Sequence, residues 1–135
     1  MIRQKIKQIL SALDYNSHEI SVVITDNQQI QQLNKTYRKI DKPTNVLAFP
    51  MQEGQFGDIT PGLLGDIVIS CETAQNEANN ANITLMERIS QLLIHGILHL
   101  IGFDHETSDI DARKMEDKSL EILRKIEHNK NLNAF

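Results

Sequence analysis

Three histidines lie close together in the segment HGILHLIGFDH, residues 95–105. His95 and His99 are four residues apart, so in a helix their side chains share one face, with Cβ atoms roughly 5–6 Å apart. Gly102 can end that helix and allow a left-handed turn that returns His105 to the helix end. Three imidazoles leave one tetrahedral position of zinc open, as in catalytic zinc sites. The spacing therefore predicts one metal ion per chain, held by His95, His99 and His105.

The helix expected to carry the first two histidines is apolar on nearly every other face, above all over residues 92–101. Such a helix is buried, and a buried polar ring without a partner costs roughly 1–3 kcal/mol. One metal ion would serve both rings. The alternative is a core histidine with a hydrogen-bond partner, which we favour for His18 and His128 in their polar surroundings. Imidazole also suits copper, nickel and iron, so zinc is inferred from the ligand type.

The spacing HxxxHxxGxxH also resembles the zinc motif HExxHxxGxxH of metzincin proteases. In those enzymes the glutamate after the first histidine is the general base. Gly96 occupies that place here and can transfer no proton, which argues against peptide hydrolysis. Glycine within a helix costs roughly 1 kcal/mol relative to alanine. We therefore expect Gly96 to admit a close neighbour, either packed backbone or a substrate phosphate.

Together with two further segments, the histidine motif resembles a second family. With HGILHLIGFDH, the segments NKTYRKIDKPTNVLAFP (34–50) and LLGDIVIS (63–70) resemble the YbeY family of metal-dependent bacterial endoribonucleases, in that family's order. The resemblance implies zinc, cleavage of single-stranded RNA, maturation of the 16S rRNA 3′ end, ribosome biogenesis and ribosome quality control. It implies the small ribosomal subunit as partner, with a ribosomal protein or a ribosome-assembly GTPase, and no DNA.

The resemblance also assigns residues. His95, His99 and His105 match the family's metal ligands, and Arg38 matches an arginine needed for activity. The sequence departs from the family pattern at Ala48, commonly a serine, and at Ile40, commonly a smaller or polar residue.

Two candidate catalytic residues are Arg38 and Asp104. A guanidinium fork at Arg38 can hold a phosphate and stabilise its growing charge, whereas the alternative is an exposed arginine at a helix end. Asp104 and Glu106 flank His105, so either carboxylate can accept a proton or orient that ring. The alternative interpretation is that both are loop carboxylates near the start of the last helix, where acidic residues are favoured.

The elements that must position these residues follow from periodicity and punctuation. Helices are expected over residues 2–13, 26–37, 71–80 and 85–101, with a last one after Ser108, and strands over 19–25, 45–49 and 66–70. Thr84 and Glu87 form a capping box for the metal-binding helix. Short strands and long helices suggest an α+β fold in a single domain over residues 1–135. The resemblance to the YbeY family implies a small mixed β-sheet packed against several helices, and the histidine spacing implies a metzincin-like zinc helix.

Composition limits the function classes. The chain has 135 residues, one cysteine and no apolar run near the ~20 residues of a membrane span, so we expect a cytoplasmic protein without membrane partners. Its net charge of −4 disfavours a generic nucleic-acid binder, yet four basic residues gather in 35–42, either as solvated surface or as a phosphate track. The alternatives to an RNA hydrolase are a non-catalytic, metal-stabilised ribosome-assembly module and a hydrolase of peptides or small molecules.

Overall fold

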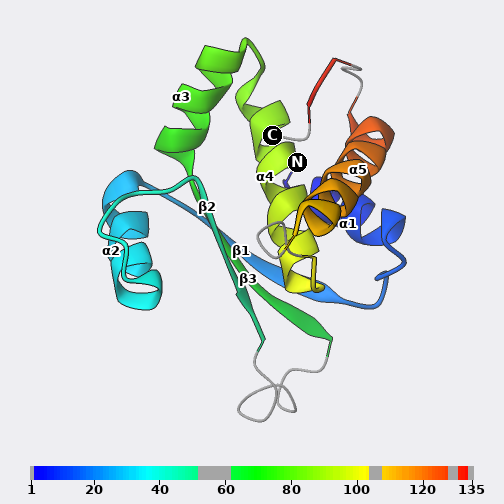
Figure 1. Cartoon of the computed structure of the whole chain (residues 1–135), viewed down its shortest axis with the longest axis horizontal. Coiled ribbons are helices and arrows are strands. Elements are labelled where there is room, and N and C mark those ends of the chain that lie inside the picture. Colours follow the sequence, from blue (N-terminus) through cyan, green and yellow to red (C-terminus); the bar gives the residue numbers. More distant parts are fainter. Residues whose placement is uncertain (1, 52–61, 104–107, 128–130, 134–135) are drawn as a thin grey trace.

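The computed structural model describes residues 2–51, 62–103, 108–127 and 131–133. Figure 1 shows the order of its elements along the chain. Within these ranges the helices are α1 (Ile2–Ala12), α2 (Asn27–Arg38), α3 (Cys71–Ala81), α4 (Leu85–Leu100) and α5 (Asp109–Ile126), and the strands are β1 (Glu19–Thr25), β2 (Val46–Pro50) and β3 (Leu63–Ser70).

The strands form one mixed sheet in the order β1-β3-β2. Strand β3 lies in the middle, parallel to β1 and antiparallel to β2, with Val23 opposite Val68 and Ala48 opposite Ile67. Burial on both faces explains why β3 reads as a nearly continuous apolar run rather than an alternating one. The predicted α+β class with a small mixed sheet is confirmed.

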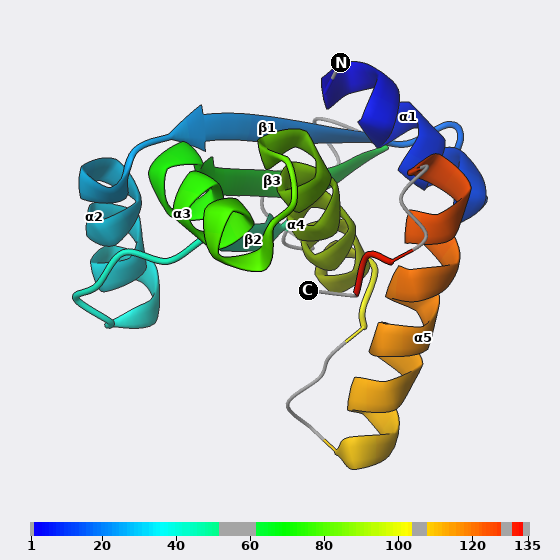
Figure 2. The ribbon, with the colours of Figure 1, turned by 90° about the horizontal axis from the view of Figure 1, so that it is seen from above.

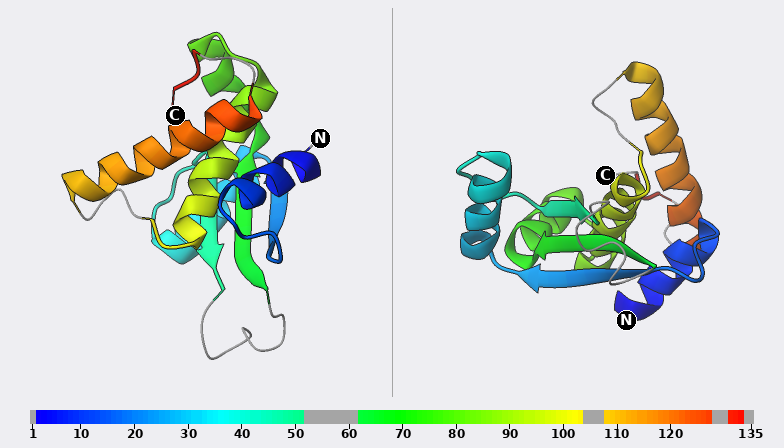
Figure 3. Two further views of the ribbon diagram at one scale, coloured as in Figure 1. Left: turned by 90° about the vertical axis from the view of Figure 1, so that its right-hand side faces the viewer. Right: turned by 90° about the horizontal axis from the view of Figure 1, so that it is seen from below.

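Alternate residues of β3 face two different apolar clusters. Ile67 and Ile69 point into the larger cluster with α4, whereas Val68 points the other way, toward Ile30 of α2 and Leu47 of β2. Helices α1 and α5 pack beside α4, and α2 lies at the opposite end of the sheet (Figures 2 and 3). The sheet is therefore sandwiched between α4 and α2, and both helices carry predicted site residues.

Two glycines allow α4 to lie close on the sheet. A Cβ atom at Gly96 of α4 would come within 2.9 Å of Ile67 Cδ1. A Cβ atom at Gly65 of β3 would meet the carbonyl oxygen of Phe49 at 2.3 Å and Leu100 Cδ2 at 2.8 Å. Side chains at these positions would push helix and strands apart, so the glycines set the depth of α4 against β2 and β3.

Helix α4 begins as the sequence predicted. The Thr84 hydroxyl accepts from the Glu87 backbone N–H at 3.1 Å, and the Glu87 carboxylate accepts from the Thr84 N–H at 2.9 Å. This reciprocal pair satisfies two N–H groups that the helix itself leaves open. The Ser108 side chain likewise caps α5, accepting from the Asp111 N–H at 3.0 Å.

Over the part of the chain that the structure describes, none of the helices has the length and apolar character to cross a membrane.

Candidate active site

His95 and His99 face each other in the last two turns of α4. Their Nε2 atoms lie 3.0 Å apart, and the ring centroids are separated by 4.5 Å at an interplanar angle of 79°. Zinc binds imidazole nitrogen at about 2.0–2.1 Å, so a single ion can reach both nitrogens across this distance. The donor type and the separation therefore fit two ligands of one zinc ion, and the ion itself stays a prediction.

The end of α4 turns the chain in the way that the sequence indicated. The Gly102 N–H donates to the His99 carbonyl at 3.1 Å, and the Phe103 N–H donates to the Leu98 carbonyl at 2.9 Å. With φ of 108° at Gly102, these two bonds form a Schellman motif, which reverses the chain just after the histidine pair.

The predicted third ligand, His105, lies outside the described residues, as do Asp104 and Glu106. Over the described ranges alone, no three histidine, cysteine, aspartate or glutamate side chains gather in a way that would bind a metal ion. The structure thus brings together two of the three predicted ligands, and the roles of His105 and Asp104 remain predictions.

A cleft of about 820 Å³ opens beside the histidine pair. Arg38, from the last turn of α2, lines the same cleft, although α2 and α4 lie on opposite faces of the sheet. Strand β2 forms the wall between them, so the cleft spans the edge of the sheet. Its lining also includes Tyr37, Thr44, Asn45, Val46, Leu47, Ala48, Phe49, Pro50, Gly96, Gly102 and Phe103.

Arg38 is exposed, and no hydrogen bond or ion pair joins its guanidinium to the residues that the structure describes. The helix ends immediately after it because Lys39 adopts the left-handed conformation, with φ of 63°. Asn34 is buried, and its side-chain amide donates to the Lys42 carbonyl at 2.9 Å, which fastens the following segment to α2. Arg38 therefore presents five open N–H donors from an anchored helix end.

Basic residues surround this helix end. Lys35, Lys39 and Lys42 are exposed beside Arg38, in a chain whose net charge is −4. One ion pair lies among them, with 3.9 Å between Lys35 Nζ and Asp41 Oδ2, and both side chains are more than half exposed. Such a solvated pair contributes little to stability. The positive charge of this rim is thus left largely uncompensated next to the cleft.

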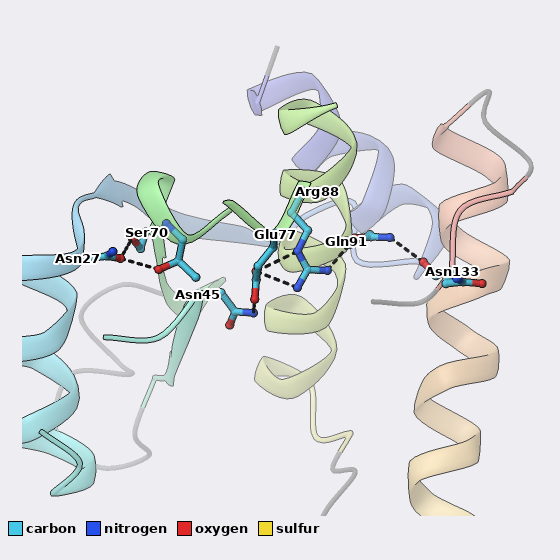
Figure 4. Close-up of polar contacts among 8 residues, drawn as sticks. Asn27, Asn45, Ser70, Glu77, Arg88, Gln91 and Asn133 are labelled. Carbon is cyan, nitrogen blue, oxygen red and sulfur yellow. Dashed lines mark hydrogen bonds and ion pairs between the residues drawn. The ribbon is translucent and has the colours of Figure 1, made fainter. Parts of the chain in front are cut away.

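A partly buried ion pair between α4 and α3 lies beside the start of β2, and the sequence analysis did not predict it. The Arg88 guanidinium of α4 donates to Glu77 Oε1 of α3 at 3.0 and 3.1 Å and to Gln91 Oε1 at 2.7 Å (Figure 4). Asn45, at the start of β2, donates to both Glu77 oxygens at 3.2 Å. Asn45 lines the cleft, so this network fixes where β2 enters it. The signal that the sequence offered for this ion pair was Arg88, a charged residue within an apolar helix.

The expectation for Gly96 is corrected. We predicted that its missing side chain admits packed backbone or a substrate phosphate. The neighbour is instead the side chain of Ile67, whose Cδ1, Cγ1 and Cγ2 atoms would lie 2.9–3.3 Å from a Cβ atom at Gly96. The glycine is needed because a fully buried β-branched side chain of β3 fills the space against α4.

Comparison with known proteins identifies similar chains. The family model described as Endoribonuclease YbeY matches residues 1–127. Proteins named Endoribonuclease YbeY from Geobacter metallireducens and Aquifex aeolicus are 46% and 48% identical, over 93% and 87% of this chain and 85% and 76% of those proteins. The solution structure of TM1509 from Thermotoga maritima superposes with a TM-score of 0.63 and 28% identity, covering 91% of this chain and 77% of that one.

Proposed function

This chain belongs to the endoribonuclease YbeY family, and we propose that it is a zinc-dependent endoribonuclease acting on single-stranded RNA. One observation carries the proposal: two histidine Nε2 atoms 3.0 Å apart share a cleft with the open guanidinium of Arg38. Ligands for a Lewis-acidic metal and a fork for a phosphate are two elements that metal-dependent phosphodiester hydrolysis uses.

In this proposal His95 and His99 hold the zinc ion together with His105. The bound ion supplies Lewis-acid chemistry at the phosphodiester. Arg38 binds two phosphate oxygens through its planar fork and stabilises the charge that develops on them. Asp104 accepts a proton or orients the His105 ring. The exposed lysines beside Arg38 attract the flanking phosphates, which makes RNA a better match than an uncharged small substrate.

We assign the biological role by the same argument. The substrate is the 3′ end of the 16S rRNA of the small ribosomal subunit. The enzyme acts in ribosome biogenesis and ribosome quality control in the cytoplasm. A ribosomal protein or a ribosome-assembly GTPase would deliver the enzyme to its substrate. Support comes from the family membership and from the exposed basic residues next to Arg38 at the end of α2.

The direct test compares cleavage of a single-stranded RNA and of its duplex by the wild type, by His99→Ala and by His18→Ala. His18 lies away from the cleft and serves as the matched histidine control. We expect the wild type and His18→Ala to cleave the single strand, with loss in chelator and recovery with zinc, and His99→Ala to be inactive.

Cleavage that persists in chelator and in His99→Ala would refute the proposal. An inactive wild type that still rescues ribosome assembly in cells would favour the non-catalytic assembly module. Digestion of casein in a metal-dependent way would favour a peptide hydrolase.

A further inference from the structure

Aromatic side chains gather in the cleft. The chain has two tyrosines, four phenylalanines and no tryptophan, and of the four rings that the structure describes, three line the cleft beside the histidine pair. They come from three separate segments: Tyr37 from α2, Phe49 from β2 and Phe103 from the turn after α4. In a chain with only 4% aromatic residues, this concentration marks the cleft as a surface for flat apolar groups.

Tyr37 is the ring that the fold leaves open. It is 65% exposed, and its hydroxyl has no hydrogen-bond partner within the described ranges. Burial and hydrogen bonding, the usual reasons for a tyrosine in a fold, therefore do not account for it. Among the exposed large apolar side chains of the described residues, which are Val23, Ile24, Tyr37, Ile40 and Ile110, Tyr37 is the one that lines the cleft.

Phe49 holds the Tyr37 ring in place. The two centroids lie 5.2 Å apart at an interplanar angle of 64°, an edge contact that leaves ring face available. Phe49 itself packs against Ile30, Leu47 and Val68 of the smaller apolar cluster. The exposed ring is thus supported by the core, and little side-chain entropy remains to be lost when a ligand stacks on it.

We propose that Tyr37, supported by Phe49, is a base-stacking site that binds one unpaired nucleobase of the RNA whose phosphate Arg38 holds. The inference rests on the proposed function and deepens it. Tyr37 and Arg38 are consecutive residues that line one cleft, so a stacking surface and a phosphate fork open into the same space. A base and its own phosphate have this relation in a single nucleotide.

The stacking site also gives a physical origin for single-strand selectivity. In a duplex both faces of a base are covered by its neighbours, so an aromatic ring cannot stack on it without unstacking the helix. An unpaired base offers a free face, and all four bases offer one, which makes such a site tolerant of sequence. Tyr37 would thus select for strandedness while leaving the sequence of the RNA open.

The test uses the intact protein with 3-fluorotyrosine in place of its two tyrosines, Tyr15 and Tyr37. The ¹⁹F resonances are assigned with Tyr15→Phe. The probes are pentauridylate with 2′-O-methyl riboses and the same backbone without bases. We expect pentauridylate to shift the Tyr37 resonance and leave Tyr15 in place, because Tyr15 packs against His18 away from the cleft. The abasic backbone should leave both resonances unmoved.

Affinity provides the second readout. Tyr37→Leu should bind pentauridylate about tenfold more weakly or worse, whereas Tyr37→Phe, which keeps the ring, should stay within about twofold of the wild type. Ile110→Ala removes an equally exposed apolar side chain from α5, outside the cleft, and should bind as the wild type does.

Equal affinity in Tyr37→Leu and the wild type would overturn the inference, as would a Tyr37 shift of the same size with the abasic backbone. A resonance moved by a phenylalanine-rich peptide but not by pentauridylate would assign the ring to a protein ligand instead. These failures leave cleavage by the wild type, and its loss in His99→Ala, intact. Failure of the proposed function would abolish that cleavage itself.

Discussion

Polar side chains interrupt the apolar surface of α4 at two places, and their surroundings differ. In the first half, Arg88 is 8% exposed and Gln91 is 4% exposed, and their partners are the Glu77 carboxylate and the Asn133 carbonyl, respectively. In the second half, His95 and His99 are only partly buried and turn their Nε2 atoms toward each other at the wall of an open cleft. One helix thus carries both a closed network and an accessible one.

This difference indicates that the first half of α4 serves folding stability and the second half serves chemistry. A buried arginine whose donors meet carboxylate and amide oxygens contributes to folding, because its burial is tolerated only while those partners remain. Two imidazole nitrogens on a cleft wall are accessible to a ligand from solution. We therefore expect substitutions in the first half to change the free energy of unfolding, and substitutions around the second half to change metal content and RNA cleavage.

Outside the metal ligands, the largest effect should follow from Arg38→Lys, a substitution in the same cleft as the histidines. Lysine keeps the charge but loses the planar fork that binds two phosphate oxygens. We expect the rate of RNA cleavage to fall about 10²-fold, in line with the loss of one stabilising donor group. Zinc content and melting temperature should not change, because Arg38 is exposed and unpaired within the described structure.

Lys35→Gln is the matched control for Arg38→Lys, since it removes a charge from the same exposed helix end, outside the cleft lining. It should lower cleavage by less than about threefold at physiological salt, where exposed charges are screened. Equal activity in the wild type, Arg38→Lys and Arg38→Ala would show that Arg38 is only a surface residue.

Arg88→Met should act on stability alone. Methionine keeps most of the volume but leaves the Glu77 carboxylate without its cation. We expect about 2 kcal/mol of destabilisation, less than for a fully buried pair because the Glu77 side chain is 36% exposed. The melting temperature should fall by about 6–8 °C.

Adding Glu77→Gln to Arg88→Met should recover part of that loss, because the uncompensated charge disappears. Zinc content should match the wild type in both variants. Loss of zinc together with stability in Arg88→Met would show that the two halves of α4 are one coupled unit, against the separation argued above.

The smallest effect is expected at the contact between α4 and the sheet, where Gly96 lies against Ile67. In Gly96→Ala the new methyl group meets Ile67 Cδ1 at 2.9 Å, so the side chain must shift. Overpacking of this kind costs about 1–3 kcal/mol, and better helix propensity returns about 1, so we expect a net loss near 1 kcal/mol.

Ile67→Val removes the Cδ1 atom and sharpens the Gly96→Ala prediction. Denaturant unfolding of the double variant should show a coupling of about 1 kcal/mol, with the two changes less harmful together than their sum. Strict additivity would mean that a glycine at position 96 is needed for a reason other than the contact with Ile67.

Much of the fold could be predicted from the sequence, because local signals decide helix starts and apolar periods. The capping box at Thr84 is present as predicted, and the last helix begins directly after Ser108 as expected. The start of β3 was predicted at Asp66 but lies at Leu63. Gly65 belongs to the strand, where it admits the close approach of Phe49. The local sequence does not determine which strands lie next to each other in the sheet.

The site was predictable where spacing along one helix determines it. The four-residue spacing of His95 and His99 was enough to predict that their side chains meet. Only the family resemblance could associate Arg38 with the histidine pair. Helices α2 and α4 contribute to one cleft across β2 only in the folded chain. The contacts of Arg88 with Glu77 and of Phe49 with Tyr37 likewise depend on the tertiary arrangement.

The central claim is that the second half of α4 is a metal site, and zinc content per chain at about pH 7.5 tests it most directly, since acid would protonate the ligands and release the ion. The account predicts one zinc ion per chain in the wild type and in Gln91→Leu, and nearly none in His95→Ala and His99→Ala. A wild-type protein that takes up no zinc, or a His99→Ala variant that retains a full equivalent, would contradict it.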